Sequence, residues 1–483
     1  MSRAARPRGH TRRGRTRAEL TRVWERTRQA PEPLRALDHG ASVEVPHALV
    51  APEIGNDGWI EPFLGANADT LARLDLRPEI STTRTGAALR LVPGARLGAM
   101  PLRSAVTRRV ALGVIVRSRF EWEGLGRVLG GVAFRVEPDV GGAALVPGSA
   151  REVPPWILAG PVLTRLADVL RHASRRFELN REIRSRPRGT VDWGDYARVS
   201  LPSGAWQRFS CSFPDLSDDR VLFSAMRWTV GRVRRELERA ADAPVGRALL
   251  DEALLLLHRL GPGPEARPGP GALATNPQLL HSGWLTAAWE AMGWVADERG
   301  LGGEQTLDGL PWSLRADALW EAWVESWLTD VARRLGAELL SGRRGETRRA
   351  LAWSGRPRTL RHLVPDFLLV MPDHHIFVDA KYKPHLMDVR RLGWDGVSQE
   401  VRESHRADVH QALAYAALSA APRVDTVLAY PVRSGALSMP SAADLPVGAR
   451  RARLVLAGLP FGFSGPAERG ASIGDLERLV RAD

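Results

Sequence analysis

The C-terminal fold is decided by the stretch Leu363-Val364-Pro365-Asp366-Phe367-Leu368-Leu369-Val370 and its continuation Ile376-Phe377-Val378-Asp379-Ala380-Lys381. Both segments are apolar and rich in β-branched or aromatic residues, and Asp373-His374-His375 supplies a turn between them. They therefore predict two strands, over 363–371 and 374–381. Asp379 and Lys381 are two residues apart and project from one face of the second strand. An antiparallel return can bring Asp366 close to that face.

Two carboxylates and one ammonium on an otherwise apolar sheet indicate chemistry, because a buried charge is costly unless it is paired or bound to a metal. Carboxylate oxygens suit Mg²⁺ (or Mn²⁺), so Asp366 and Asp379 are the expected metal ligands. A bound metal would polarise a phosphodiester and acidify a water molecule. Lys381 could position that water, help to deprotonate it, or neutralise charge on the phosphate. The alternative is an exposed ion pair at the edge of a sheet.

The lysine content supports the chemical interpretation. The chain has 68 basic residues, and all of them are arginine except Lys381 and Lys383. In a sequence this biased toward arginine, lysine is expected to persist where a compact ammonium cannot be replaced by a planar guanidinium. Both lysines lie in the segment Asp379-Ala380-Lys381-Tyr382-Lys383, which indicates that this segment carries the chemistry.

An amphipathic helix precedes the strand pair, in the wider range 314–336. Its segment 318–328 has tryptophans on the core stripe and places Glu321 and Glu325 one turn apart on the flank. Either glutamate could complete the metal site, and we favour Glu321 as a catalytic residue and metal ligand. The alternative is that both glutamates are solvated.

A second helix follows the strand pair, at about 405–421. It places Gln411 and Tyr415 at i and i+4, where they could bind a phosphate or order the metal-site network. We include both among the candidate catalytic residues. A packed tyrosine with a solvent-facing glutamine is the alternative, and His410 is expected on the flank of the helix.

Length and composition limit the class of protein. A chain of 483 residues has room for two or three domains. Cys211 is the single cysteine, which excludes an intrachain disulfide framework and a zinc cluster built from cysteines. No apolar run approaches the roughly 20 residues that span a bilayer, and the N-terminus lacks the apolar stretch of a secretory signal. We therefore expect a cytoplasmic protein with no membrane association.

The net charge of +13 is concentrated at the N-terminus, where residues 1–30 are rich in arginine and lack apolar periodicity. This composition predicts a disordered basic arm that attracts phosphate backbones without reading sequence. The alternative is a solvated tail without a role. The candidate nucleic-acid contacts are Lys383, Arg12, Arg13, Arg15 and Arg17.

The rest of the chain divides by its turn and periodicity signals. Short strands such as 88–92, 109–116 and 132–136 predict a β-rich N-terminal domain over 31–150. A mainly helical middle region is expected over 151–260, with helices at 156–183 and about 219–260. It is followed by a Gly/Pro linker at 261–272, a nuclease domain over 273–465, and a C-terminal helix or tail at 466–483. The nuclease domain is expected to hold helices at 277–296, 314–336 and 405–421, and strands at 363–371, 374–381, 424–430 and 451–458. This order predicts an α/β domain with a mixed sheet flanked by helices.

At these residues the chain resembles a known family. The elements "VPDFLLV", "IFVDAKYK", "DVHQALAYA" and "VLAYP", with "LPWSLRADALWEAWVESWL" upstream, resemble the PD-(D/E)xK nuclease domain of McrC. McrC is the effector subunit of McrBC-type, modification-dependent restriction systems. The resemblance covers about 85–465 and is specific over 313–431. The resemblance implies that Glu321, rather than Glu325, belongs to the metal site, and it assigns Gln411 and Tyr415 to a Q-x-x-x-Y element. The basic arm and the Gly/Pro linker depart from the family pattern.

The resemblance implies a division of labour in antiviral defence. A β-rich N-terminal region would dock on a hexameric AAA+ NTPase of the McrB type, and this chain would cut DNA. No G-x-x-x-x-G-K-[ST] phosphate loop occurs in the sequence, so a motor must come from another chain. Two alternatives remain: a stand-alone nuclease acting on RNA or branched DNA, and a catalytically silent DNA-binding activator of an NTPase.

Overall fold

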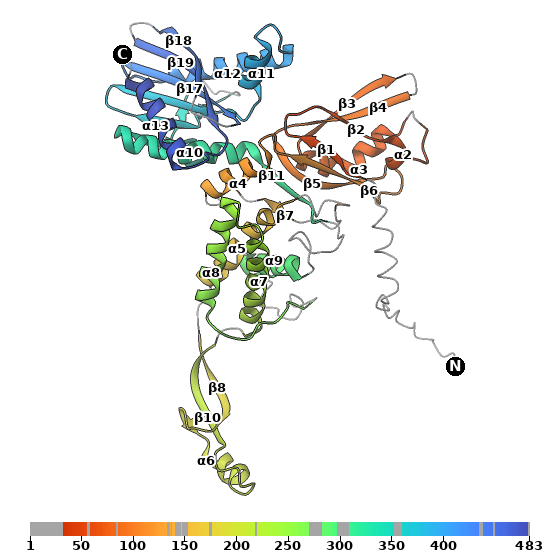
Figure 1. Ribbon diagram of the computed structural model, residues 1–483, viewed down its shortest axis with the longest axis vertical. Coiled ribbons are helices and arrows are strands. Elements are labelled where there is room, and N and C mark those ends of the chain that lie inside the picture. Colours follow the sequence, from red (N-terminus) through yellow and green to blue (C-terminus); the bar gives the residue numbers. More distant parts are fainter. Residues whose placement is uncertain are drawn as a thin grey trace, which may run out of the picture. The chain divides into compact units, whose positions relative to one another are not determined.

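The computed structural model describes residues 32–55, 58–83, 86–132, 136, 138–140, 146, 153–172, 176–217, 220–269, 283–296, 309–351, 360–433, 438–447 and 450–481. By its internal contacts the chain forms two compact units. The first comprises Met1–Pro154, Ala243–Val245 and Gly302–Asp483, and the second comprises Pro155–Asp242 and Gly246–Leu301. Both contain helices and sheets, so the fold class is mixed α/β (Figure 1).

The N-terminal part of the first unit holds two small sheets. One has the order β1-β6-β5-β11-β7, with β1 (Leu34–Leu37), β6 (Val110–Arg117), β5 (Arg96–Arg103), β11 (Trp312–Arg315) and β7 (Asp139–Val140). The other has the order β2-β4-β3, with β2 (Val43–Glu44), β4 (Gly86–Pro93) and β3 (Leu76–Thr83). The helices of this part are α2 (His47–Val50), α3 (Ile60–Arg73) and α4 (Glu121–Gly131).

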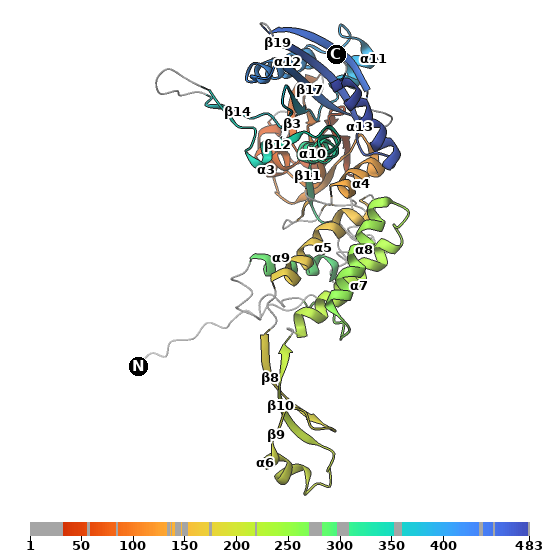
Figure 2. The same ribbon diagram turned by 90° about the vertical axis from the view of Figure 1, so that its left-hand side faces the viewer.

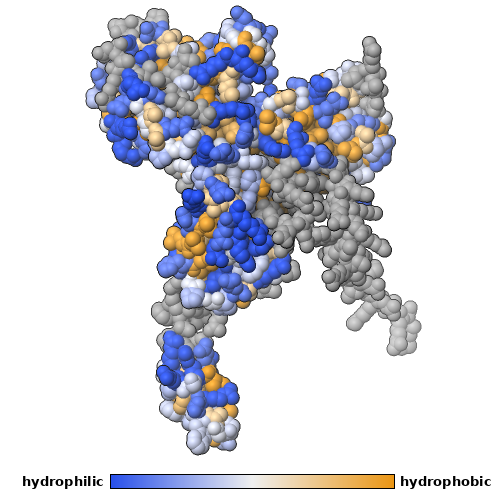
Figure 3. Space-filling model, viewed as in Figure 1, coloured by the Kyte–Doolittle hydropathy of each residue, from blue (hydrophilic) through white to orange (hydrophobic). Residues whose placement is uncertain are grey.

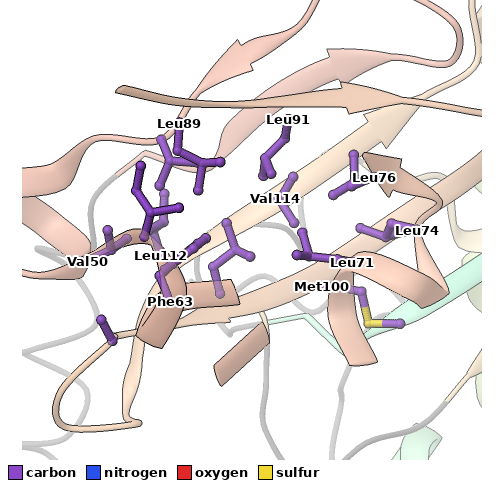
Figure 4. Close-up of a cluster of buried hydrophobic side chains, with 14 of the residues drawn as sticks. Val50, Phe63, Leu71, Leu74, Leu76, Leu89, Leu91, Met100, Leu112 and Val114 are labelled. Carbon is purple, nitrogen blue, oxygen red and sulfur yellow. The ribbon is translucent and has the colours of Figure 1, made fainter. Parts of the chain in front are cut away.

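An apolar core joins helices α2 and α3 to strands of both sheets. Phe63 and Leu71 of α3 pack against Leu89 and Leu91 of β4 and against Val114 of β6, all of them buried (Figure 4). Alternation along β4 places Leu89 and Leu91 on the same face, which explains why a short strand contributes two core residues. Removing these side chains from water is the main stabilising contribution in this part.

Strand β11 links the N-terminal part to the C-terminal part. Trp312–Arg315 pairs with β5 in antiparallel register, and Arg315 leads directly into helix α10 (Ala316–Leu335). The helix that precedes the candidate site therefore begins at the N-terminal sheet. Two observations show how closely β11 packs. Trp312 is buried, and a Cβ added at Gly98 of β5 would lie 2.2 Å from the Trp312 carbonyl oxygen.

The C-terminal part is built on a six-stranded mixed sheet of order β12-β15-β16-β17-β19-β18. Pairing is antiparallel except between β16 and β17 and between β17 and β19, which are parallel. The strands are β12 (Glu338–Ser341), β15 (Phe367–Val370), β16 (His374–Ala380), β17 (Arg423–Val432), β18 (Ser438–Val447) and β19 (Arg450–Pro460). A separate two-stranded pair, β13 (Arg349–Ala350) and β14 (His362–Leu363), precedes β15.

Helices cover both faces of this sheet (Figures 1 and 2). Helix α12 (Gln399–Ala417) packs on one face through Tyr415 and Ala416, which contact Leu368 and Phe377. Helix α11 (His385–Leu392) lies on the same side, where Leu386 packs in a cluster with Leu428 of β17. Helices α10 and α13 (Pro466–Arg481) lie together on the other face.

The second unit consists of helices and a two-stranded ribbon. Its helices are α5 (Pro155–His172), α7 (Arg220–Glu238), α8 (Pro244–Leu260) and α9 (Gly283–Ala296). Strands β8 (Arg176–Arg184) and β10 (Phe209–Ser217) form the ribbon, and β9 (Thr190–Val191) pairs with β10. A short α6 (Trp193–Asp195) and a π-helical turn (Tyr196–Ser200) lie between β9 and β10.

Several expected elements have different bounds. The helix expected over 156–183 ends at His172, and a strand begins at Arg176; the expected helix over 219–260 is two helices, α7 and α8. Strand 88–92 lies within β4 and strand 109–116 corresponds to β6, whereas most of the expected strand 132–136 lies outside the described residues. Helix α9 begins at Gly283; residues 277–282 of its expected range also lie outside the described residues. Among the residues that the structure describes, no helix has the length and apolar character needed to cross a membrane.

Candidate active site

The two aspartates meet where β15 and β16 pair. Phe367 of β15 is opposite Val378 of β16, so Asp366, one residue earlier, is next to Asp379. The backbone N–H of Ala380 donates to Asp366 Oδ2 at 2.8 Å, which fixes this carboxylate against the strand. Antiparallel register thus brings together two acids that are 13 positions apart in the sequence.

Asp379 is close enough to Asp366 to affect the ionisation of that carboxyl group. Burial, followed by the charge and hydrogen bond of Asp379, raises the pKa of Asp366 to about 8. The Ala380 N–H opposes this shift but does not cancel it. A negative charge on Asp366 is therefore unfavourable in this position unless a cation lies close to it.

Lys381 supplies the nearest positive charge. Its Nζ lies 2.8 Å from Asp379 Oδ2 and donates to Gln411 Oε1 at 2.8 Å. Burial lowers the pKa of Lys381, but the charge and hydrogen bond of Asp379 outweigh burial, and the pKa lies above its ordinary value. Lys381 is therefore an ammonium at neutral pH, which favours a positioning or charge-neutralising role over that of a base.

Helix α12 supplies the partners of Lys381. Ser398 caps its N-terminus by accepting a hydrogen bond from the Val401 N–H, and one face of the helix then packs on the sheet. Gln411 Nε2 donates to the Tyr415 hydroxyl at 2.5 Å, and that hydroxyl donates to the Val364 carbonyl at 3.4 Å. Gln411 is exposed as a whole residue, yet both ends of its amide are bound within the site.

The two glutamates of α10 differ in their environment. Glu325 is buried and accepts a hydrogen bond from Arg344 at 2.7 Å, so it is held in an ion pair. Glu321 is partly buried, and burial raises its pKa; its charge in turn raises the pKa of Asp366. Of the two, Glu321 is the one that acts on the aspartate pair.

The number of carboxylates close together at the site limits how a metal ion could be bound. Within the described part of the chain, no three His, Cys, Asp or Glu side chains are grouped closely enough to hold a metal ion. Glu321 therefore does not form a ready three-carboxylate group with Asp366 and Asp379. The two aspartates alone fit Mg²⁺, which commonly uses one or two carboxylates and takes its other ligands from water and substrate phosphate. The proton that Asp366 retains near neutral pH is the one that a divalent cation would displace.

A second charged cluster lies beside the site, and the sequence analysis did not identify it. Asp408 of α12 is buried and accepts hydrogen bonds from Lys383 Nζ at 2.7 Å and from the Tyr430 hydroxyl at 3.3 Å. Lys381 Nζ is 3.7 Å from the same carboxylate, so Asp408 connects the two lysines. The available signal was the spacing of Asp408 and Gln411 at i and i+3, which puts both on the face of α12 toward the sheet.

The residues expected to contact nucleic acid are placed unequally. Lys383 is partly exposed and is paired with Asp408 and Ser404. Arg12, Arg13, Arg15 and Arg17 lie outside the described residues. His410 is exposed, as expected for the flank of its helix.

Arg343 was not predicted as a contact and lies beside the acids. It belongs to the short 3-10 turn Gly342–Arg344, where the Gly342 N–H donates to the Asp366 carbonyl at 2.8 Å. A Cβ at Gly342 would lie 2.7 Å from the Pro365 carbonyl oxygen, so this close approach requires glycine. Arg343 is exposed, and its charge acts on Glu321.

Comparison with known proteins gives structural matches only. No family model and no curated protein matches the sequence. A chain of the tetradecameric assembly of Thermococcus gammatolerans McrB AAA+ hexamers with bound McrC matches with 15% identity and a TM-score of 0.42, over 93% of this chain and 100% of that chain. A chain of the T. gammatolerans McrBC complex matches with 14% identity and a TM-score of 0.25, over 62% of this chain and 88% of that chain. Both assemblies are McrBC complexes, the family whose motifs this sequence resembles.

Proposed function

We propose that the chain is a Mg²⁺-dependent nuclease of the PD-(D/E)xK type. One observation carries the proposal: Asp366 and Asp379 lie against each other with the Lys381 ammonium 2.8 Å from Asp379. Buried Asp379 beside partly buried Asp366, whose pKa is raised to about 8, is an unfavourable arrangement unless a cation is its normal partner. The ammonium beside it suits a substrate that carries negative charge.

Each residue has a part in the proposed hydrolysis of a phosphodiester. Asp366 and Asp379 would hold the divalent cation, which supplies a Lewis acid for the phosphoryl group and lowers the pKa of the attacking water. Lys381 stays protonated and neutralises charge that develops on the phosphate. Gln411 and Tyr415 hold the Lys381 ammonium in place through the chain of hydrogen bonds from Lys381 to Val364. Glu321 would contribute negative charge at the edge of the cation site.

Arg343 is the proposed phosphate contact next to the acids. Because one Arg–phosphate contact contributes one released counterion, Arg343→Ala is expected to reduce the slope of log K against log salt for DNA binding by about 1. Binding is measured in metal-free buffer on DNA duplexes of several sequences, so cleavage does not interfere. Arg334→Ala is the matched control, since Arg334 is exposed in the last turn of α10, about 20 Å along the helix from Glu321. An unchanged slope in Arg343→Ala would remove it from the contact surface.

The proposed partner is an AAA+ NTPase of the McrB type, as McrB is for McrC in the archaeal assembly described above. The motif resemblance and the lack of a phosphate loop in this sequence support it. The end of the ribbon of the second unit, between β9 and β10, also suits a protein partner, because its Trp193 and Trp206 are 63% and 67% exposed. Figure 3 shows hydrophobic residues among hydrophilic ones over this ribbon. Exposed tryptophans are enriched where binding energy is concentrated.

Two single substitutions locate the docking surface. If the ribbon docks, Trp206→Ser is expected to weaken association with the NTPase at least tenfold, since hot-spot tryptophans contribute about 2 kcal/mol or more. If the N-terminal sheets dock, Ile80→Ser is the substitution that weakens it, because Ile80 is 62% exposed on β3. Association is measured by fluorescence anisotropy with labelled NTPase. Wild-type affinity in both variants would show that neither surface is used.

Cleavage of a substrate panel tests the function. The panel comprises methylated and unmethylated plasmid, branched DNA and RNA, each with Mg²⁺, with and without the NTPase and its nucleotide. Cleavage of methylated DNA only in the presence of the NTPase supports a restriction effector, and cleavage by the chain alone supports a stand-alone nuclease. If no substrate is cut while NTP hydrolysis by the partner is still stimulated, the chain is an activator and the nuclease proposal fails.

A further inference from the structure

The segment that carries both lysines leaves the sheet before it reaches them. Strand β16 ends at Ala380, and Lys381 to Lys383 have no regular secondary structure. Two backbone hydrogen bonds hold the segment: the Lys381 N–H donates to the Ala429 carbonyl at 2.8 Å, and the Lys383 N–H donates to the Lys381 carbonyl at 2.9 Å. Besides the side-chain partners of the two lysines, the contacts of the residue between them determine where this segment lies.

That residue, Tyr382, is anchored in the N-terminal part of the same unit. Its side chain is buried, and its hydroxyl donates to Asp38 Oδ2 at 2.7 Å. Asp38 follows β1 directly and is 344 positions away in the sequence. It is completely buried, so the tyrosine hydroxyl reaches a carboxylate to which water has no access.

Arg119 completes the cluster and holds Asp38 rigid. The Arg119 backbone N–H donates to Asp38 Oδ1 at 2.5 Å, and its guanidinium donates to Asp38 Oδ2 at 3.1 Å. The Asp38 N–H in turn donates to the Arg117 carbonyl at 2.9 Å, which ties the ends of β1 and β6 together. A buried carboxylate with this many donors has one defined position.

The ring of Tyr382 is held by cation–π and aromatic contacts, in addition to the hydrogen bond of its hydroxyl. The Arg119 guanidinium lies 4.7 Å from the centre of the Tyr382 ring, within the range of a cation–π interaction. Phe461, which follows β19, has its ring centre 5.9 Å from that of Tyr382 and stacks on Phe120 at 4.4 Å. Tyr382 is thus clamped between residues that follow β1 and β6 and a residue that follows β19.

We propose that the cluster Asp38–Arg119–Tyr382 positions Lys381 and Lys383 for catalysis, so that the N-terminal part is a working component of the active site. The side chain of Tyr382 binds Asp38, whereas those of the two lysines bind Gln411 and Asp408 of α12. If the residues around Asp38 were displaced, Tyr382 would move with them and would shift the lysines on either side of it. The inference rests on the proposed nuclease function and names its positioning residues.

Tyr382→Phe and Asp38→Asn test the inference. Tyr382→Phe removes only the hydroxyl and leaves the ring packing, so it is expected to lower kcat about tenfold with the KM for DNA unchanged, because small errors in the placement of catalytic groups reduce the rate strongly. Asp38→Asn is expected to act in the same direction. Asp425→Asn is the matched control: Asp425 is also buried and binds an arginine, Arg453, but it lies in β17 opposite Ile376, three residues before Asp379. Its kcat per folded molecule is expected to stay at the wild-type value.

Backbone hydrogen exchange gives a second readout that needs no activity. The amides of Lys381 and Lys383 are expected to exchange at least tenfold faster in Tyr382→Phe than in wild type or in Asp425→Asn. If wild type cuts no nucleic acid, the nuclease proposal fails, and the exchange rates still show whether Tyr382 holds the lysine segment. Wild-type kcat and wild-type exchange in Tyr382→Phe would overturn the inference. So would a loss of activity that only matches the loss of folded protein on thermal unfolding, since that is a purely structural effect.

Discussion

Lys381→Arg is expected to lower the rate of Mg²⁺-dependent cleavage by about 10²–10³, although it preserves the positive charge. Lys381 Nζ bridges Asp379 and Gln411, each at 2.8 Å, in a space that fits a compact ammonium. A planar guanidinium is longer and presents its donors in a fixed fork, so it cannot make both contacts from the same backbone position. The expected loss is that of a preorganised group that stabilises charge in the transition state. Single-turnover cleavage with enzyme in excess measures it.

Arg334→Lys, the reverse exchange at an exposed site in the last turn of α10, is the matched control and is expected to cut at the wild-type rate. The comparison also tests the interpretation of the lysine content. If charge alone were needed, a chain in which nearly all basic residues are arginine would accept arginine here as well. Near-wild-type cleavage by folded Lys381→Arg would contradict the proposed role of this side chain.

Asp379→Asn is expected to abolish cleavage and, in metal-free buffer, to reduce the loss of thermal stability that we expect of wild type as the pH rises through about 8. Asp379 is 2% exposed, and its charge contributes to the raised pKa of Asp366. The substitution removes the negative charge that opposes ionisation of Asp366, but it also breaks the ion pair with Lys381, so the Tm is compared across pH within each protein. Cleavage loses a proposed metal ligand. Thermal unfolding on both sides of pH 8, with and without Mg²⁺, measures the first effect, and the Mg²⁺-induced rise in Tm that we expect of wild type should be absent from the variant.

The pH dependence of wild-type stability has a definite sign. The folded protein binds the Asp366 proton more tightly than the unfolded chain does, because the pKa is raised from 3.8 to about 8. The stability contributed by this proton is fully present below the unfolded pKa and is lost as pH rises through about 8. Mg²⁺ should restore stability at the alkaline end. Asp425→Asn, which breaks a buried ion pair with Arg453, should instead destabilise the protein. An equal fall in Tm as the pH rises through about 8 in Asp379→Asn and in wild type, both in metal-free buffer, would contradict the account of the acid pair.

The local part of the site could be predicted from the sequence because strand alternation and helical spacing determine it. Asp379 of β16 and Lys381, which follows that strand, have their side chains 2.8 Å apart, and Gln411 and Tyr415 are hydrogen-bonded one turn apart on α12, as their spacing predicts. The sequence also indicated the apolar pair of strands that places Asp366 beside Asp379. The roles of these residues remain proposals.

The long-range part could not be predicted, because local patterns contain no information about pairing between distant segments. Asp38 and Tyr382 are 344 positions apart, and neither position has a local pattern that indicates the other. Strand β11 directly precedes the helix of the candidate site but pairs with β5, which only the tertiary structure shows. The prediction of a helix over 156–183 was wrong at its C-terminal end for a different reason. The segment Phe177-Glu178-Leu179-Asn180 continues an apolar spacing that suits a helix, but pairing with β10 makes it a strand.

The most direct test of the central claim is single-turnover cleavage of end-labelled DNA by wild type, Lys381→Arg and Asp379→Asn, with Mg²⁺ and with the cognate NTPase and its nucleotide present. The account predicts that wild type cuts, that addition of EDTA stops the reaction, and that both variants bind the same DNA but do not cut it at a comparable rate. Cleavage by both variants at the wild-type rate would show that the chemistry resides elsewhere and would contradict the assignment of Asp366, Asp379 and Lys381 as the active site.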